Sequence, residues 1–548
     1  MFALPQRARL ILAFIATCFF VRAAFYAISY PVWEGYDEWS HYSVIERVAL
    51  RHELLVDRDQ PVSLRIADSL KLAPVPWQLR DAPPPSITQD AFWRLSQSER
   101  EARERAFERL PAQVAIEKRD EAFRAYEALQ PPLYYWLMAP LLALLREMDL
   151  GTSIIILRLA GCALATLTIP LVYGVARSTF GSAPIALGCA AIAALMPELC
   201  INIARVGNES LAVPLFTALT WLAAEGCRSG LGCRRSAALG CILGCGLLTK
   251  AYFLTMLPVL ALIFFLAYWR LRLQPWIAVR NAALAYLIAG AIGGWWYIRN
   301  VLTTSTISGL CESVTLHSLS TREFLTRAMR ANYASGIDVI LFSHLWFGGW
   351  SALTIRSWMY HLFYLVIFLA GIGLVRCRFR GFGPTSAIYF VFWLGLLYNV
   401  ALLFLSKGIS TCMGWYLYAA IGAEIVLCWG GLRELLPDRF GSWIAALGVS
   451  LFGLLDLYTV HAVSLPYYTG MIAHRANGSL AALHGSDWAR VGLVTAISRL
   501  GAFKAGWGSP AVLGFSWALY FLGTLSLIGL GIRLSCEPPE GTHGRNSS

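Results

Sequence analysis

Three ionisable residues lie close together in the segment PVWEGYDEWSHYSVIERVALRHELLV, directly after the first apolar run of the chain. Asp37 and Glu38 form an acidic pair, and His41 follows four residues after Asp37. On a helix, positions i and i+4 share a face, so Asp37 and His41 are expected to face one point. A carboxylate at the edge of a hydrocarbon layer is poorly solvated and is therefore a better general base. The alternative is structural: the two acids stabilise a helix N-terminus, and His41 is solvated.

The composition of the chain indicates what must position these residues. Of the 548 residues, 57% are hydrophobic and only 14% are charged, and the mean hydropathy is +0.56. A soluble domain has about 25% charged residues, so the composition excludes a soluble enzyme, a disordered chain and a secreted disulfide scaffold. The net charge of +12 does not indicate nucleic-acid binding, because the basic residues are spread over short connections between apolar runs. We predict an all-α polytopic membrane protein.

Apolar runs of membrane-spanning length recur along the chain. A helix needs about 20 apolar residues to cross the bilayer. About twelve segments approach that length: 9–30, 154–176, 182–203, 208–226, 236–250, 251–269, 277–298, 357–375, 384–405, 415–432, 441–462 and 511–533. The apolar segment 131–145 is shorter, so we predict a helix that lies in the outer membrane interface there.

The positions of Lys and Arg predict the orientation of these spans. Basic residues are concentrated in alternate connections, and such connections face the cytoplasm. This rule predicts a multi-pass protein of the plasma (cell inner) membrane with both termini in the cytoplasm. Three long segments then lie outside: 31–153, 299–356 and 463–510.

The chain is predicted to have three parts. Residues 1–460 form a transmembrane catalytic module that includes the large first outer loop, and 299–356 form a second outer loop. Residues 461–548 comprise an outer segment, the last span and a cytoplasmic tail. Within the first loop, 98–110 and 117–129 have the pattern of amphipathic helices.

The acidic pair after the first span resembles the signature of the GT-C superfamily of integral-membrane glycosyltransferases, which includes the protein O-mannosyltransferases and the bacterial aminoarabinose transferases. With His41 included, it is similar to a bacterial branch whose motif is Pro-Asp-Glu-x-x-His, although Tyr36 stands in place of the proline. Other similar segments follow in order: QPPLYYWLMAPLLALL (130–145), LRLAGCALATLTIPLVYGVAR (157–177), MPELCINIARVGNESLA (196–212), LLTKAY (247–252) and WWYIRN (295–300).

The resemblance implies a donor sugar linked to a polyprenyl phosphate and a reaction on the outer side of the membrane. Asp37 would take the proton from the acceptor, Glu38 would orient the acceptor or Asp37, and a single displacement would invert the anomeric carbon. The acceptor is a glycan, a lipid or a protein, and the identity of the sugar stays open. No cofactor is required. Because Asp37, Glu38 and His41 offer oxygen and nitrogen donors, a bound divalent metal stays open as an alternative.

A lipid-linked donor presents its phosphate at the outer headgroup level, beside basic residues at helix ends. Lys250 and Arg299 are the first candidates for phosphate contacts, because a cation stabilises the departing phosphate. The resemblance adds Gln130, which stands where the family has Lys or His, and Tyr134 of the same segment. Further candidates for the site are His41, Arg205 and Lys407.

Two other classes of function fit parts of this pattern. A transporter or flippase of lipid-linked or small solutes would also be polytopic, but transporters place polar groups near the bilayer midplane, at broken helices of paired repeats. A polymerase or ligase that joins glycans on a lipid carrier shares the outer geometry. The densest group of ionisable residues lies in the predicted outer loops, which favours an enzyme over a transporter.

Several residues have expected structural partners. Glu424 and Asp456 are acids within later spans, where a charge is costly, so each is expected to face a cavity or a partner. Arg22 of the first span is a candidate partner. Cys311 and Cys412 fall in predicted outer loops, where a disulfide between them is an alternative to two thiols.

Overall fold

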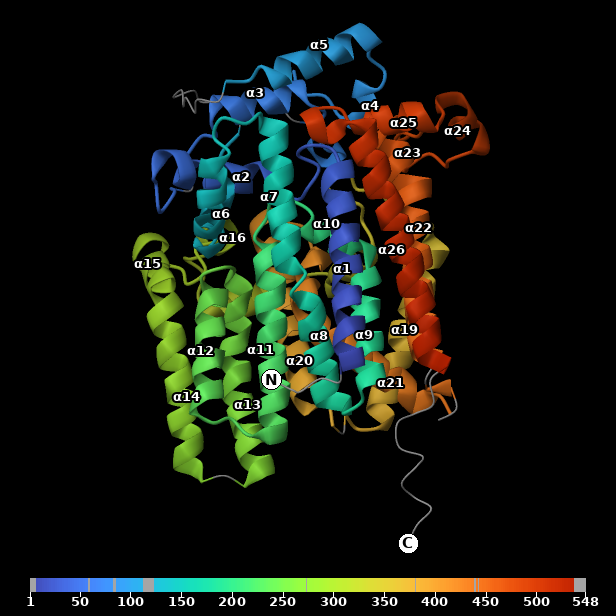
Figure 1. Cartoon of the computed structure of the whole chain (residues 1–548). Helices are drawn as coiled ribbons and strands as arrows, with labels where there is room; N and C mark the ends of the chain where they lie inside the picture. Colours follow the sequence, from blue (N-terminus) through green and yellow to red (C-terminus); the bar gives the residue numbers. More distant parts are fainter. Residues whose placement is uncertain are drawn as a thin grey trace.

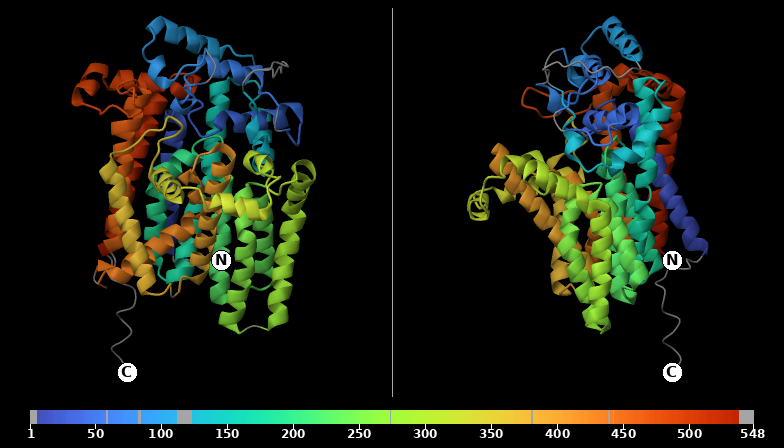
Figure 2. Two further views of the ribbon diagram at one scale, coloured as in Figure 1. Left: turned by 180° about the vertical axis from the view of Figure 1, so that it is seen from behind. Right: turned by 90° about the vertical axis from the view of Figure 1, so that its left-hand side faces the viewer.

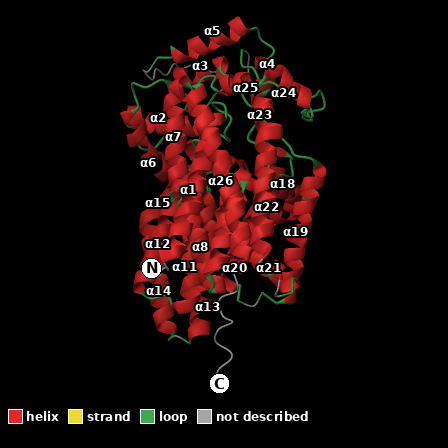
Figure 3. Ribbon diagram, turned by 45° about the vertical axis from the view of Figure 1, so that its right-hand side comes forward, coloured by secondary structure: helices red, strands yellow, loops and turns green. Residues whose placement is uncertain are grey.

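The computed structural model describes residues 6–57, 60–81, 85–111, 123–272, 274–379, 381–437, 440–441 and 443–536. Within these ranges the chain consists of helices and loops, with isolated β-bridges but no β-strand, as Figure 3 shows. The helices stand side by side in a bundle that carries a smaller helical cap at one end (Figure 1). The predicted all-α polytopic membrane fold is confirmed.

Ten helical segments of the described chain are long and apolar enough to cross a membrane, or eleven if one bent pair is a single span. They are α1 (Gln6–Ser29), α7 (Leu150–Ala165) with α8 (Thr168–Phe180), α11 (Glu209–Ser229), α13 (Met256–Leu271) with the preceding 3₁₀ turn, α14 (Pro275–Ala289) with α15 (Trp295–Thr304), α19 (Ser357–Arg376), α20 (Gly383–Lys407), α21 (Ile421–Leu435) with the preceding 3₁₀ turn, α22 (Trp443–Tyr458) with α23 (Leu465–Tyr468), and α26 (Pro510–Cys536).

The predicted number of about twelve spans is larger than this count. The segment predicted at 236–250 is helix α12 (Cys233–Leu247), which has 15 residues. A span needs about 20 residues, so α12 is not counted by length, but it stands beside α11 and α14 in the bundle (Figure 1). The other eleven predicted segments each coincide with a helix or a helix pair of the bundle.

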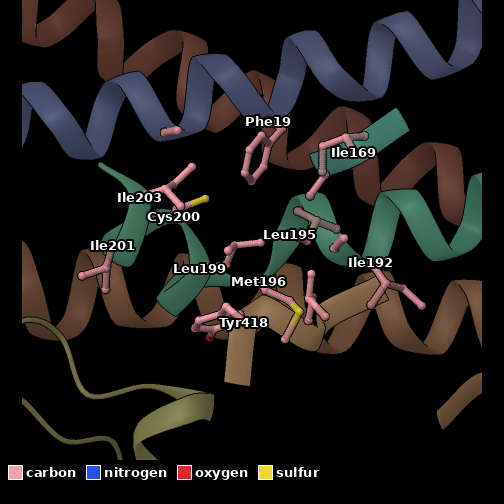
Figure 4. Packing of buried hydrophobic residues seen from close by; sticks show 14 of the residues in the cluster. Phe19, Ile169, Ile192, Leu195, Met196, Leu199, Cys200, Ile201, Ile203 and Tyr418 are labelled. Atoms are coloured by element: carbon pink, nitrogen blue, oxygen red, sulfur yellow. The ribbon is translucent and has the colours of Figure 1, made fainter. Parts of the chain in front are cut away.

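The bent pair consists of α9 (Ala183–Leu195) and α10 (Pro197–Ile203), whose axes differ by 63°. The break is at Met196, which is extended (φ −65°, ψ 114°) because the following Pro197 disfavours a helical conformation there. Figure 4 shows Leu195 and Met196 at this break, with Phe19 of α1 and Tyr418 nearby. All four side chains are buried. The guanidinium of Arg22, another buried residue of α1, donates to the carbonyls of Ala194 and Leu195 at this break.

The cap lies at the end of the bundle opposite to the start of α1 and the end of α26 (Figures 1 and 2). Its helices come from the first long loop and from the segment before α26: α2 (Glu38–Arg51), α3 (Leu64–Leu72), α4 (Gln89–Phe92), α5 (Gln97–Glu108), α6 (Leu133–Leu144), α24 (Gly485–Val491) and α25 (Leu493–Leu500). The helix predicted at 98–110 is confirmed as α5, and the short apolar helix predicted at 131–145 is α6.

The helix predicted at 117–129 lies partly outside the described residues. Its described part contains only a 3₁₀ turn, Tyr126–Leu129, so a helix over this part is wrong. The preceding residues instead form an extended contact, in which Val62 N donates to the Phe123 carbonyl (3.1 Å) and Ala125 N to the Gln60 carbonyl (3.0 Å). These two hydrogen bonds hold residues 123–125 against residues 60–62 of the cap.

The segment after residue 460 packs directly on the first loop. Asp90 at α4 accepts hydrogen bonds from the backbone N of His474 (2.6 Å) and the hydroxyl of Tyr467 (3.0 Å), and it pairs with the His474 ring at 3.0 Å. Trp77 stacks on the same ring, with 4.2 Å between centroids. The second loop forms α16 (Cys311–Thr315), α17 (Thr321–Ala328) and α18 (Tyr333–Leu345) beside the bundle.

The acids within the spans have partners, as predicted. Asp456 of α22 forms a fully buried ion pair with Arg22 of α1 at 2.9 Å, and Glu424 of α21 pairs with His344 at 2.8 Å. Cys412 is buried and contacts Asn399, whereas Cys311 is exposed. No disulfide joins these two cysteines, so that alternative is wrong for this structure.

Candidate active site

Asp37 stands at the first residue before α2, in a conformation that differs from that of an ordinary helix cap. Its backbone is left-handed (φ 57°, ψ 15°), and its side chain makes no capping hydrogen bond to α2. Its Oδ1 instead accepts a hydrogen bond from the Tyr126 hydroxyl at 2.6 Å. The side chain is half-buried. The alternative role for Asp37, stabilising the helix N-terminus through a cap, is therefore not supported by this geometry.

A second carboxylate, Glu127, lies beside Asp37. Burial and the negative charge of Asp37 raise the pKa of Glu127 to about 8, against opposing effects of Lys250, Arg205 and the Gln130 side chain. Burial also raises the pKa of Asp37, although the Tyr126 hydrogen bond and nearby cations lower it. Two neighbouring carboxylates titrate as a pair. With a pKa of about 8, Glu127 favours its protonated form near neutral pH.

His41 faces the same carboxylate. The Tyr135 hydroxyl donates to the Glu127 carbonyl at 3.1 Å, so it accepts from His41 Nδ1 at 2.9 Å. Burial and the charges of Arg205 and Lys250 hold the pKa of His41 well below its usual range, so the ring is neutral. Its unprotonated Nε2 then faces Glu127 Oε2 at 3.6 Å. A protonated Glu127 fits this position, because two acceptors would otherwise oppose each other.

Glu38, the second residue of the acidic pair, points away from this group. Its carboxylate accepts two hydrogen bonds from Arg158 of α7, at 2.6 and 2.5 Å, and a third from the backbone N of Val206 at 2.9 Å. Both side chains are buried. Arg158 also donates to the carbonyls of Ala27 and Pro31. Glu38 therefore fixes the start of α2 to the bundle.

Lys250 lies in a buried setting between α12 and α13. Its ammonium pairs with the Glu209 carboxylate and donates to Asn208 Oδ1 at 3.1 Å. It also lies 5.2 Å from the ring centroid of Tyr416. The positive charge of Lys250 acts on both Asp37 and Glu127. One of its three N–H donors is left for a further ligand.

Arg205 is a second cation of the group. Its guanidinium donates to the backbone and side-chain oxygens of Asn202, both at 3.0 Å, and to the Tyr36 carbonyl. Gly35 permits this close approach, because a Cβ at that position would lie 2.5 Å from the Arg205 Cβ. Arg205 forms no ion pair with a carboxylate in the described part of the chain. It contributes positive charge at Asp37 and Glu127.

Two other predicted site residues, Lys407 and Arg299, have partners of their own. Lys407 is exposed and pairs with Glu312 at 2.6 Å, yet its charge also reaches Asp37. The Arg299 guanidinium lies 5.0 Å from the ring centroid of Trp296 on the same helix. The cations that lower the pKa of Asp37 most are Arg205, Lys250 and Lys407, and Arg299 is not among them.

The two polar residues of the 130–145 segment have local roles. The Gln130 side chain lowers the pKa of Glu127, while its buried Oε1 has no hydrogen-bond partner in the described residues. The Tyr134 hydroxyl accepts a hydrogen bond from the backbone N of Gly207 at 3.1 Å and is buried. Tyr134 therefore holds the loop that carries Arg205.

Two buried carboxylates anchor the segment that leads to Asp37. Glu34 accepts hydrogen bonds from the backbone N and the hydroxyl of Ser351, at 2.7 and 2.9 Å. Glu198 of α10 accepts from the backbone N of Phe347 at 2.8 Å and from the Tyr36 hydroxyl at 2.7 Å. The residues before Asp37 are thereby fastened to α10 and to the loop after α18.

Sequence reasoning missed Glu127, Tyr126 and Arg158. Glu127 lies four residues before Pro131, within the predicted amphipathic helix 117–129. The available signal was a single acid, Glu127, next to the segment 130–145 that resembles the GT-C superfamily. Among the described residues, no three His, Cys, Asp or Glu side chains come close enough to hold a metal ion.

Comparison with known proteins finds a match to a family model. Residues 129–296 match the family model of dolichyl-phosphate-mannose-protein mannosyltransferase, which covers less than a third of the chain. Among solved structures, the chain is similar to ArnT from Cupriavidus metallidurans bound to undecaprenyl phosphate, at a TM-score of 0.46 and 13% identity, over 95% of this chain and 77% of that chain. No curated protein matches the sequence. The family match confirms the resemblance to the GT-C superfamily, and the matched residues include Gln130, Arg205 and Lys250.

Proposed function

We propose that the chain is a membrane glycosyltransferase that moves a sugar from a polyprenyl phosphate to an acceptor, with Asp37 as general base. One observation carries the proposal. The half-buried Asp37 side chain makes no capping hydrogen bond to α2, and the positive charges of two buried cations, Lys250 and Arg205, act on it. The family match supports the donor class, since the name of that family specifies a dolichyl-phosphate-linked sugar.

The reaction follows from the charges of the site. Asp37 takes the proton of the acceptor hydroxyl or amine, whose lone pair forms the new bond to the anomeric carbon. The bond from that carbon to the phosphate oxygen breaks, and the phosphate leaves with the bonding electrons. Lys250 and Arg205 stabilise the negative charge that grows on the phosphate. A single displacement of this kind inverts the anomeric carbon.

Glu127 supports this step by keeping the site at one negative charge. With a proton on Glu127, Asp37 is the ionised member of the pair and is available as the base. If both acids were ionised, the second charge would oppose the departure of an anionic phosphate. Glu38 acts on the reaction only by holding the start of α2 through Arg158. The proposed reaction uses no cofactor.

The side of the membrane follows from the positive-inside rule. The connections rich in Arg lie at the end of the bundle opposite to the cap, so the cap and Asp37 face the outside or periplasm and both termini face the cytoplasm. A glycan, lipid or protein acceptor then reaches Asp37 from the side of the cap. The proposed module 1–460 carries the catalytic groups, and the part after it contributes to the cap.

A transporter would need a different arrangement. Transporters of the broken-helix type place two interrupted helices opposite each other around a midplane site. The described residues contain one bent pair, α9 and α10, and no second bent pair opposite it. The carbonyls at its break accept hydrogen bonds from Arg22, whose charge is paired with Asp456. The enzyme is therefore the function that the geometry supports best.

The test is a transfer assay with the full chain in proteoliposomes. Dolichyl-phosphate and undecaprenyl-phosphate sugars with radiolabelled sugar are supplied together with a membrane extract as the source of acceptor. We expect release of the lipid phosphate and label in the acceptor by the wild-type protein and by Asp68→Asn, an exposed acid of the same cap. Asp37→Asn should bind donor but release none. Equal release by Asp37→Asn would overturn its role, and solute flux without transfer would favour a transporter.

A further inference from the structure

Helix α17 of the second outer loop is amphipathic. It begins at a capping box, in which Ser320 Oγ accepts a hydrogen bond from the backbone N of Glu323 (3.3 Å) and the Glu323 carboxylate accepts one from the backbone N of Ser320 (3.0 Å). Successive residues of a helix are 100° apart. One half of α17 and of the turn after it is therefore apolar, with Phe324, Leu325, Ala328 and Met329. The other half is polar, with Arg322, Glu323, Thr326, Arg327 and Arg330.

The rest of the protein covers only part of this apolar half. The Phe324 ring contacts the Tyr398 ring of α20, with 5.6 Å between centroids, and Ala328 is buried. Leu325 and Met329 point away from α20 and are 59% and 77% exposed. Large apolar side chains with such exposure, next to each other on one helix face, indicate a further contact for that face.

The height of α17 in the bundle indicates what makes this contact. Figures 1 and 2 show the second loop below the cap, at the height where α15 ends, and projecting sideways from the bundle. The loop is also attached to the end of α20, where Lys407 pairs with Glu312 at 2.6 Å. Tyr398 precedes Lys407 by nine residues, so Phe324 contacts α20 about 13 Å along the helix from its end. The headgroup layer is only about 5–8 Å thick, so α17 reaches the depth of the hydrocarbon boundary.

The surface of α20 beside α17 faces lipid. Phe390, Leu394 and Tyr398 follow one another at a spacing of four residues, and they are 64%, 49% and 53% exposed. Residues at this spacing share one face of a helix, and α20 is one of the helices that can span a membrane. The exposed apolar face of α17 therefore continues the lipid-facing surface of a span.

The polar half of α17 is basic. Arg322, Arg327 and Arg330 stand against Glu323 alone in this segment, and all three arginines are exposed. An amphipathic helix with apolar side chains on one face and arginines on the other lies in the plane of a membrane interface and is attracted to anionic lipids. The charge pattern of α17 thus matches phosphate headgroups above an apolar layer.

We propose that α17 lies in the membrane interface on the cap side, on anionic lipids. Leu325 and Met329 insert among the acyl chains, and Arg322 and Arg330 contact headgroup phosphates. The second loop is then seated partly in the bilayer, although the sequence pattern places it in water. The proposal uses no group of the candidate active site, so it does not depend on the proposed function.

The test measures the depth of nitroxide labels on the full chain in phosphatidylcholine bilayers that contain phosphatidylglycerol. Single cysteines replace Leu325, Met329 or Thr326, in a background in which the exposed Cys233, Cys241, Cys311 and Cys536 are serines. Oxygen concentrates in hydrocarbon and a nickel chelate stays in water. We expect the ratio of their collision rates to be several-fold higher for Leu325→Cys and Met329→Cys than for Thr326→Cys, the control on the polar half.

A second comparison tests the headgroup contacts. In the Met329→Cys chain, the ratio should be higher with phosphatidylglycerol than in phosphatidylcholine alone. Arg322→Gln combined with Arg330→Gln should abolish this difference, whereas Arg146→Gln, an exposed arginine of the cap, should preserve it. All replaced side chains are exposed, so the fold should be retained.

Three results would overturn the proposal. A nickel collision rate as high at residue 329 as at residue 326 would place α17 in water. Shielding of residue 329 from both reagents would place a protein, and not lipid, against this face. A ratio that is the same with and without phosphatidylglycerol would exclude the contacts of the arginines with anionic headgroups.

Discussion

Arg158 holds Glu38 through two hydrogen bonds of 2.6 and 2.5 Å, in an ion pair with both side chains buried. This relationship divides the Asp37–Glu38 pair into two functions. Asp37 faces Glu127 and the cations, whereas Glu38 joins α2 to α7. Adjacent residues at a helix start point in different directions, so one acid is available for chemistry and its neighbour for structure.

The first prediction concerns this ion pair. Glu38→Gln leaves Arg158 as a buried cation without a counter-ion, so we expect a loss of about 3–5 kcal/mol of stability. Thermal unfolding in detergent measures it. The double variant Glu38→Gln with Arg158→Met should recover part of the loss, because both charges are then removed. A Glu38→Gln protein as stable as the wild type, but inactive, would instead indicate a direct catalytic role for Glu38.

The second prediction concerns the pH dependence of transfer. Burial and the charge of Asp37 raise the pKa of Glu127 to about 8, so Glu127 loses its proton as the pH rises through that value. We expect wild-type kcat/KM to rise as Asp37 ionises and to fall again above about pH 8. Glu127→Gln mimics the protonated acid, so it should stay active and lose the fall on the alkaline side. An unchanged alkaline fall in Glu127→Gln would contradict the shared proton.

The third prediction separates the two cations first expected at the donor phosphate. Lys250 acts on Asp37, while Arg299 lies over Trp296. Donor binding should weaken about ten-fold or more in Lys250→Gln, since a charge-assisted contact is lost, and little in Arg299→Gln. Combining Lys250→Gln with Glu209→Gln avoids an unpaired buried acid and controls for misfolding. Equal losses in the Lys250 and Arg299 variants would mean that Arg299 also contacts the donor.

The fourth prediction concerns stability against pH. Burial raises the pKa of Glu34 to about 8, from an ordinary value of 4.5, although Ser351 donates to it. A group with a raised folded pKa contributes stability below its unfolded pKa and loses that contribution as pH rises through the folded value. Wild-type Tm should therefore fall between about pH 4.5 and 8 more steeply than the Tm of Glu34→Gln. Parallel Tm curves for the two proteins would show that Glu34 does not titrate in this range.

Much of the fold could be predicted from the sequence, because spans depend on local hydrophobicity. Eleven of the predicted segments coincide with spans or a bent pair, and the twelfth is the 15-residue helix α12. The pairing of Asp456 with Arg22 also followed from the cost of a charge in lipid.

The arrangement of the candidate site was less predictable. It depends on contacts between residues far apart in the chain, such as Tyr126 with Asp37 and Arg158 with Glu38. Periodicity does not report such contacts, so Glu127 looked like one acid of a solvated helix. Arg299 and Lys250 are both cations at helix ends in the sequence, and only packing distinguishes them.

The tethers of Glu34 and Glu198 have a consequence for biosynthesis. Ser351, which donates two hydrogen bonds to Glu34, lies 317 residues later in the chain. The segment before Asp37 therefore cannot reach its final conformation until the loop after α18 has been translated and inserted. A ribosome-bound nascent chain that ends before this loop should contain every acid of the site and still be catalytically silent. The enzyme would become active late in its own synthesis, once residues translated long afterwards have packed against its N-terminal part.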